Sequence, residues 1–317
     1  MKPRAAAVIA LLLFAALFAA GCRTARKDGA ARPDVVRAAA PSSPEALRLA
    51  VEKVRPLHRE MGRPPPGDWL DTFPEPGQTF EEYLQSTPTR PTQERRTIYV
   101  QPLGEFTPAQ LRIVALTAEY MSRFFGLPVR LLEKREIGNV PKSARRISLW
   151  GDKQIQSSYI TLNILRPSLP PDAAALIAFT SSDLFPDETL NFVFGQASLS
   201  ERVGVWSLYR LGRPDASEAE FKLTLLRTLK IAAHETGHMF SIRHCKKYEC
   251  VMNGTNHLAE TDRHPLEACP ECMAKLCWAA GVDPRERYAR LAAFCAEHGL
   301  EDERQRFEAL ARALDKN

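Results

Sequence analysis

The stretch HETGHMFSIRHC, from His234 to Cys245, contains three of the seven histidines of this 317-residue chain. Residues four apart lie on one face of a helix, so His234 and His238 can present two imidazole nitrogens to one metal ion, with Glu235 beside them. His244 follows six residues later, which on a continuing helix would place it about 9 Å further along the axis and on another face. The sequence therefore predicts that the helix ends near residue 240, and that the turn makes His244 a third ligand and leaves a fourth position open for water.

Ser241 occupies the position at which such a turn would most easily use glycine. A serine with the positive φ of a glycine would carry a strain of roughly 1 to 2 kcal/mol. Two possibilities stay open. The chain turns there despite the strain, or the hydroxyl satisfies a helix-end backbone group in a turn of another shape.

Four cysteines follow in two short-spaced pairs. Four residues separate Cys245 from Cys250, and two separate Cys269 from Cys272. Paired loops of this kind are typical of a closed, structural zinc site with four thiolate ligands. Disulfides are the alternative, because an exported chain meets an oxidising compartment and an even number of cysteines, six, follows Cys22.

The first 22 residues, MKPRAAAVIALLLFAALFAAGC, combine a basic start, an apolar run and small residues before Cys22. The run is about 16 residues long, too short for a membrane span and typical of an export signal, so residues 1–21 are interpreted as a signal peptide. The AAGC ending resembles the lipobox of bacterial lipoproteins, which implies that Cys22 carries the lipid; an ordinary signal peptide is the alternative. The sequence predicts an exported, membrane-anchored lipoprotein that faces the periplasm or the cell exterior.

Composition and charge describe one sizeable globular domain with extensions. The net charge of +5, of which residues 1–21 contribute Lys2 and Arg4, is too small and too scattered to indicate nucleic acid as a partner. Residues 22–66, rich in Ala, Arg and Pro, are interpreted as a lipidated tether with one helix from Pro44 to Glu60. Residues 283–317 are predicted to be a helical C-terminal extension packed on the body.

Between residues 67 and 282, sequence patterns typical of strands alternate with patterns typical of helices. TIYVQPLG, from Thr97, has the alternation of a strand, and a helix is expected between Thr107 and Gly126. A long helix from about Ser217 to Phe240 carries the first two histidines. Strands mixed with helices predict an α+β domain. Further strands are expected at Val129 to Leu132, Ile147 to Trp150, Ala175 to Thr180, Phe192 to Phe194 and Arg202 to Leu211, and a helical segment around Ile155 to Leu165.

The pattern HExxHxxxxxH, followed by C-x4-C-x-M and later by C-x2-C, resembles the archaemetzincins, and most closely their animal-type branch. The resemblance covers roughly residues 67–282, including GDWLDTFPEPGQTFEEYL, and departs from the family at Ser241, where the family has glycine. It implies a metzincin-like zincin domain, with a mixed twisted sheet and a long active-site helix, and two zinc ions per chain. It assigns the catalytic zinc to His234, His238 and His244, the general base to Glu235, the structural zinc to Cys245, Cys250, Cys269 and Cys272, and the methionine of the Met-turn to Met252.

The expected activity is that of a zinc metallopeptidase, which hydrolyses peptide bonds with a zinc-activated water and Glu235 as general base. The partner is then a peptide or protein substrate, and the resemblance indicates that the strand RVGVWSLYRL pairs with it in extended form. Tyr209, Arg210 and His257 are candidates for stabilising the oxyanion. A non-catalytic zinc-binding lipoprotein that acts as a binding module is the alternative; Glu235 argues against it, because metal binding alone needs no carboxylate beside the ligands.

Overall fold

The computed structural model of the protein describes residues 42–198 and 200–315. The predicted signal peptide, Cys22 and the first part of the predicted tether lie outside these ranges. No helix within them is long and apolar enough to cross a bilayer. The longer helices are α1 (Pro44–Val54), α4 (Pro108–Phe125), α6 (Glu218–Met239), α8 (Pro270–Ala280), α9 (Pro284–Glu297) and α10 (Glu301–Asp315), and the short ones are α2 (Trp69–Thr72), α3 (Phe80–Gln85), α5 (Ser157–Tyr159) and α7 (Leu258–Arg263).

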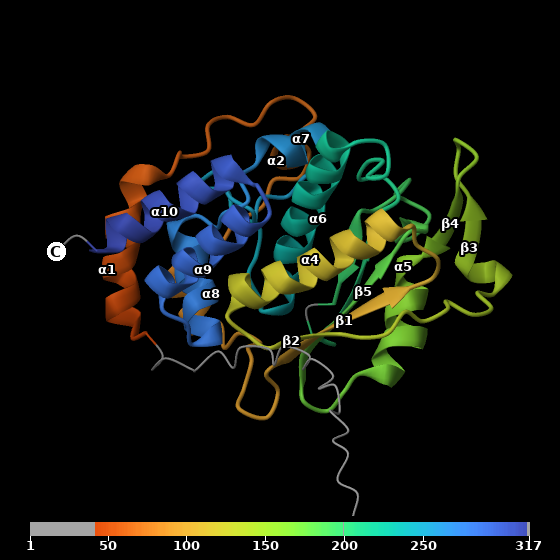
Figure 1. The fold of residues 1–317 in the computed structure, drawn as a ribbon, viewed down its shortest axis with the longest axis horizontal. Helices are drawn as coiled ribbons and strands as arrows, with labels where there is room; N and C mark the ends of the chain where they lie inside the picture. Colours follow the sequence, from red (N-terminus) through yellow and green to blue (C-terminus); the bar gives the residue numbers. More distant parts are fainter. Residues whose placement is uncertain (1–41, 199, 316–317) are drawn as a thin grey trace, which may run out of the picture. The chain divides into compact units, whose positions relative to one another are not determined.

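A five-stranded sheet in the order β2-β1-β5-β8-β7 lies at the centre of the domain (Figure 1). β2, β1, β5 and β8 are parallel, and β7 runs antiparallel to β8. A second, three-stranded sheet has the order β3-β4-β6. Mixed sheets combined with helices confirm the predicted α+β class. The strands are β1 (Thr97–Leu103), β2 (Val129–Leu131), β3 (Arg145–Ile147), β4 (Lys153–Gln156), β5 (Ala173–Thr180), β6 (Asp183–Phe185), β7 (Gly195–Ala197) and β8 (Val203–Ser207).

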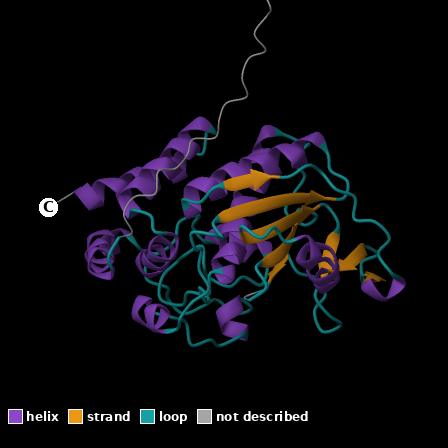
Figure 2. Ribbon diagram, turned by 90° about the horizontal axis from the view of Figure 1, so that it is seen from below, coloured by secondary structure: helices purple, strands orange, loops and turns teal. Residues whose placement is uncertain are grey.

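Both faces of the central sheet are covered. Successive side chains of a strand point to opposite faces, and in β1 Ile98 and Val100 join the large core beneath α4 and α6, whereas Tyr99 and Leu103 join a smaller core with the π-helical segment Ile160–Leu165. Figure 2 shows helices on either side of these strands. The sheet is therefore a rigid layer on which α6 rests.

The helix that carries the histidines begins and ends as the sequence predicts. The Ser217 hydroxyl accepts a hydrogen bond from the N–H of Glu220 and caps the first turn of α6. Leu225 and Leu229 are among the buried residues of its core-facing side. Packing against the sheet and α4 thus fixes α6, so that its last two turns can hold reactive side chains in place.

The tether interpretation of residues 22–66 is wrong for α1. This helix packs against α8 and α10, and the side chains of Leu47 and Val54 are fully buried. It stops at Val54, before the expected end at Glu60, and a 3-10 turn that contains Pro56 follows. The amphipathic helix thus belongs to the domain core. The C-terminal helices α9 and α10 also pack on the body, as predicted, α9 against α4 and α10 against α9 and α1.

Three of the expected elements are displaced. The strand expected at Ile147 to Trp150 is instead the end of β3 and a turn, in which the side chain of Leu149 is 87% exposed and Gly151 has a φ of +88°. The helical segment expected from Ile155 starts at Ser157, because the preceding residues still belong to β4. The strand expected at Phe192 to Phe194 is also displaced, since β7 begins directly after it, at Gly195. Apolar residues in a hairpin turn resemble a strand when only their composition is considered.

Candidate active site

His234, His238 and His244 come together at the C-terminal end of α6. Their ligand nitrogens lie within 4.8 Å of one another, and their ring centroids are 4.5 to 5.1 Å apart. His234 and His238 share a helix face, and the turn after α6 brings His244 to them. The structure thus assembles the three residues that the sequence assigns to one metal.

An oxygen atom orients each of the three imidazoles through Nδ1. Because Nδ1 donates its proton to that oxygen, Nε2 is left unprotonated and free to bind a metal. The acceptors are the Val251 carbonyl at 2.9 Å from His234, the Ile242 carbonyl at 2.6 Å from His238 and the Glu75 carboxylate at 2.8 Å from His244.

The facing nitrogens fit a zinc ion. The Nε2 atoms of His234 and His238 are 3.0 Å apart. Two unprotonated nitrogens at that distance repel each other unless a cation lies between them. Zn–N bonds of about 2.0 to 2.1 Å in a tetrahedral site separate two ligand nitrogens by about 3.3 Å, close to the observed spacing.

The turn after α6 is a Schellman motif with Ser241 in the left-handed conformation, at a φ of +62°. The N–H of Ser241 donates to the His238 carbonyl at 2.8 Å, and the N–H of Ile242 donates to the Gly237 carbonyl at 3.1 Å. The Ser241 hydroxyl accepts a hydrogen bond from the N–H of Thr89 at 3.0 Å. The serine therefore turns as a glycine would, and its hydroxyl bonds to a loop amide rather than to a helix-end group.

Residues from an earlier part of the chain hold this turn. The Tyr83 hydroxyl donates to the Phe240 carbonyl at 2.7 Å. The Gln78 side-chain amide donates to the Ser241 carbonyl at 3.3 Å and accepts from the N–H of Arg243 at 3.2 Å. The last carbonyls of α6 and the chain beyond it are thus satisfied by side chains rather than by water.

Glu75 was not recognised from the sequence. Its carboxylate accepts hydrogen bonds from His244 and, at 2.8 Å, from the Trp69 indole N–H, and the Trp69 ring lies 5.4 Å from the His244 ring. These residues belong to the stretch GDWLDTFPEPGQTFEEYL, which contributed to the resemblance. No spacing rule could assign them a role, because Glu75 and His244 are 169 residues apart.

Glu235 faces a cleft of about 720 Å³, lined by α6, β7, residues 189–194 and residues 251–256. Burial raises the pKa of its carboxyl group to about 7. A second hollow, of about 680 Å³, shares Ala197, His238 and His244 with the cleft and is otherwise lined by residues 75–78 and 241–243 and by Ser86. The two spaces therefore meet at His238 and His244.

The prediction that RVGVWSLYRL pairs with substrate is wrong. Its strand, β8, is hydrogen-bonded to β5 on one side and to β7 on the other, so it has no free edge. β7 is the edge strand, and its residues Gly195, Gln196 and Ala197 line the cleft beside Glu235. Periodicity identifies strands but does not reveal their order in a sheet.

The three residues considered for the oxyanion do not line the cleft. The Tyr209 hydroxyl donates to Asp152 at 2.6 Å, and Arg210 binds the buried carboxylate of Asp183. His257 caps α7, where its Nδ1 accepts from the N–H of Glu260. Their contacts are structural.

Met252 lies under the pair of helical histidines. Its side chain is fully buried, and a Cβ atom added to Gly237, which lies between His234 and His238 in α6, would come within 2.6 Å of the Met252 sulfur. The glycine of HETGH thus allows the close approach of an apolar floor to the helix.

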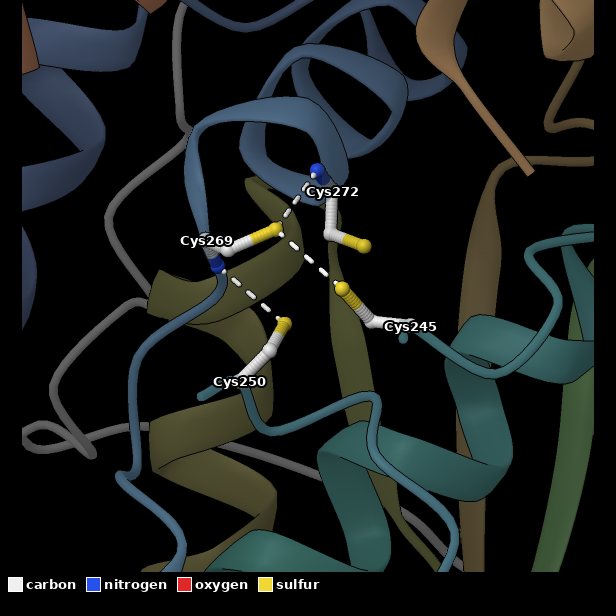
Figure 3. Close-up of side chains that lie close together, drawn as sticks. All are labelled: Cys245, Cys250, Cys269 and Cys272. Carbon is white, nitrogen blue, oxygen red and sulfur yellow. Dashed lines mark hydrogen bonds between the residues drawn. The ribbon is translucent and has the colours of Figure 1, made fainter. Parts of the chain in front are cut away.

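The four paired cysteines form a second cluster (Figure 3), with all four sulfurs within 4.8 Å of one another. The sulfurs of Cys245 and Cys269 are 3.6 Å apart, close to the roughly 3.8 Å that Zn–S bonds of about 2.3 Å give in a tetrahedron. Backbone N–H groups donate to Cys250 and to Cys269, which favours thiolates. All six cysteines in the described ranges are free, and the geometry favours a metal over disulfides.

Known proteins resemble this chain over most of its length. Residues 155–277 match Peptidase family M54. The chain is 36% identical over 264 residues to archaemetzincin-2 of Macaca fascicularis and 35% identical over 264 residues to human archaemetzincin-2, and each alignment covers 71% of both chains. A crystal structure of an archaemetzincin from Methanopyrus kandleri aligns at 29% identity with a TM-score of 0.48, over 60% of this chain and 97% of that chain.

Together with the histidine cluster, these relatives identify a zinc metallopeptidase. The chain belongs to the archaemetzincin family. The family and the activity expected from the sequence are thereby confirmed, and the peptidase match argues against the non-catalytic alternative.

Substitutions of Ser241 separate the two contributions found at the turn. Ser241→Ala keeps the positive φ and loses the hydrogen bond from Thr89, so we expect it to lower the free energy of unfolding by about 1 kcal/mol. Ser241→Gly loses the same bond but relieves the left-handed strain, so we expect it to stay within about 0.5 kcal/mol of the parent. Denaturant melts with saturating zinc measure both. A glycine variant less stable than the alanine variant would contradict the need for a left-handed residue here.

Proposed function

We propose that the protein hydrolyses peptide bonds at the three-histidine site, with a zinc ion held by His234, His238 and His244 and with Glu235 as the general base. The observation that carries this proposal is the arrangement of the imidazoles. All three are fixed at Nδ1 by oxygen atoms, and their ligand nitrogens lie together beside the half-buried carboxylate of Glu235 in a cleft. A bound zinc ion supplies a Lewis acid that lowers the pKa of water and polarises a peptide carbonyl.

Glu235 moves the protons of the reaction. Its carboxylate takes a proton from the water that attacks the scissile carbonyl and later delivers a proton to the leaving amine. Burial is the cause that raises the pKa of its carboxyl group to about 7, which suits a group that takes up and releases a proton near neutral pH. Gly195 of β7 forms the cleft wall next to this carboxylate, since a Cβ atom at that position would lie 3.5 Å from the Glu235 side chain.

β7 is the strand against which substrate binds in extended form. It is the edge of the central sheet, and its free side borders the cleft. An extended peptide that adds to such an edge gains main-chain hydrogen bonds and places alternate side chains in pockets. The cleft and the second hollow, both of which are lined by Ala197 of this strand, supply space for those side chains.

The second zinc ion binds to Cys245, Cys250, Cys269 and Cys272 and has a structural role. All four thiols are buried, so the site is closed and leaves no open position for water. Four thiolates enclosed together would repel one another without a cation. The mature chain therefore contains two zinc ions.

Replacing the proposed base tests the mechanism. We expect Glu235→Gln to lower kcat/KM for peptide cleavage by at least about a hundredfold, because the amide cannot accept the proton, while zinc content and stability are kept. Cleavage of a peptide library measures the loss. Glu218→Gln, in the exposed first turn of the same helix, is the matched control and should cleave like the parent. Parent-like cleavage by Glu235→Gln would refute the assignment.

The two metal sites are tested by counting zinc and thiols. Elemental analysis should give two zinc ions per chain in the parent and one in His244→Ala, because this substitution removes a ligand of the histidine site alone. In the parent and in His244→Ala, the four paired cysteines should resist alkylation until a chelator is added. One zinc or less in the parent, together with disulfides among these cysteines, would refute the second site.

The localisation proposal depends on the sequence of residues 1–22 alone. The protein is exported through the signal peptide of residues 1–21 and anchored to the membrane by a lipid on Cys22. We expect Cys22→Ala to release the mature protein from the membrane fraction or to leave an uncleaved precursor, because the thiol is the attachment point. Fractionation and mass spectrometry of the N-terminus measure this. A parent protein that is soluble and unmodified would contradict lipidation.

A further inference from the structure

Lys230 is the one lysine or arginine among the described residues that line the cleft. It precedes His234 by four positions on α6, so it lies on the face that carries the metal ligands, about 6 Å further along the helix. Glu235 is the one carboxylate among the same lining residues. The cleft therefore has a single cation at the end away from the turn, one helical turn from the proposed reaction centre.

The ammonium group of Lys230 is held but not neutralised. Its Nζ donates to the carbonyls of Thr261 and Asp262, at 3.1 and 3.2 Å, where α7 ends. An ammonium group has three donors, so one remains free. The side chain of Asp262 is engaged elsewhere, since Arg227 binds both of its oxygens at 2.7 and 2.6 Å. No carboxylate in the described ranges lies within 4.0 Å of Lys230.

The surroundings favour an anionic ligand over a neutral one. Lys230 is partly buried, and burial lowers its pKa by disfavouring the charged form. The carboxylates of Asp262, Glu303 and Glu267 oppose this shift only in part, and an anion close to Nζ would oppose it further. His264, which also lines the cleft, is neutral at pH 7, since its pKa is lowered to about 4 mainly by burial, so it adds no competing charge. A hydrogen bond between an ammonium and a carboxylate is about twice as strong as one between neutral groups.

We propose that Lys230 forms a subsite for a substrate carboxylate next to the scissile bond, and that the peptidase prefers substrates with an acidic residue or a free C-terminus at that position. The proposal depends on the peptidase function proposed above. The two carbonyl contacts fix Nζ at the wall of the cleft that the histidines also line, and the third N–H meets the substrate carboxylate. Lys230 is thus a determinant of specificity and takes no part in proton transfer.

Matched peptide pairs test the charge alone. Alanine-based hexapeptides that differ by one Glu or Gln, and others that differ by a free or amidated C-terminus, are cleaved by the zinc-loaded full chain. We expect the parent to favour the carboxylate member of at least one kind of pair by about tenfold in kcat/KM. A preference within the Glu/Gln pairs would identify a side-chain carboxylate as the ligand. A preference within the free/amidated pairs would identify the C-terminal carboxylate. Lys230→Met should reduce the preference to about twofold or less, and Lys230→Arg should retain it.

The controls separate specificity from stability. A lysine that only caps α7 would change both members of a pair equally, so the ratio within each pair is the deciding measurement. Lys222→Met, on the same helix but outside the cleft lining, should keep the parent ratio. A parent without preference for either kind of carboxylate, or a Lys230→Met variant with an unchanged preference, overturns the proposal.

A binding measurement distinguishes this proposal from the proposed mechanism. In the Glu235→Gln background, a fluorescein-labelled acidic hexapeptide from the same series should bind about tenfold more weakly when Lys230→Met is added. Binding that depends on Lys230 supports the subsite even if the Glu235 variant still cleaves, an outcome that would refute only the assigned base. Equal binding with and without Lys230 overturns the subsite and leaves the peptidase function intact.

Discussion

The hydrogen bond between His234 Nδ1 and the Val251 carbonyl is the contact through which the rest of the site is organised. Val251 lies between Cys250, whose sulfur belongs to the cysteine cluster, and Met252, whose side chain packs under Gly237. Three consecutive residues thus serve the second cluster, the orientation of a metal ligand and the floor of the active site. A shift of this short segment would disturb all three at once.

The other end of the same loop is equally constrained. His244 and Cys245 are adjacent and belong to different clusters, and the N–H of Cys245 donates to the Met252 carbonyl at 2.7 Å. The Asn253 side chain closes the loop by donating to the carbonyls of Cys245 and Tyr248. The structural zinc ion proposed above would contribute about 10 to 16 kcal/mol to folding, which is large compared with the 1 to 2 kcal/mol of strain at Ser241. The loop can therefore hold a serine where a less constrained chain would need glycine.

What the sequence predicted well was local. The extent of helix α6 and the convergence of the histidines follow from spacing and helical periodicity, and the short spacing of the cysteine pairs predicts that they cluster. The contacts of Glu75 and Gln78 could not be predicted, because they are made through space by a loop without regular structure. The prediction that β8, rather than β7, pairs with substrate was wrong for a related reason, because the order of strands in a sheet depends on how the whole chain packs. The helix α1 was misjudged because its flanking Pro-rich and Ala-rich sequence resembles a linker, although its apolar face is buried.

The contacts that hold the catalytic turn also determine when the site can form during folding. Thr89, Tyr83, Gln78 and Glu75 reach residues 240 to 244 across 152 to 169 positions of sequence. Contacts of such high sequence separation close late, because a long loop must be ordered before they contribute any stability. A chain that lacks these contacts therefore has two histidines on its helix and the local bonds of the turn, but Glu75 does not yet orient His244. The site is complete only when residues 75–89 have packed against residues 240–244, so its assembly depends on contacts between distant parts of the sequence.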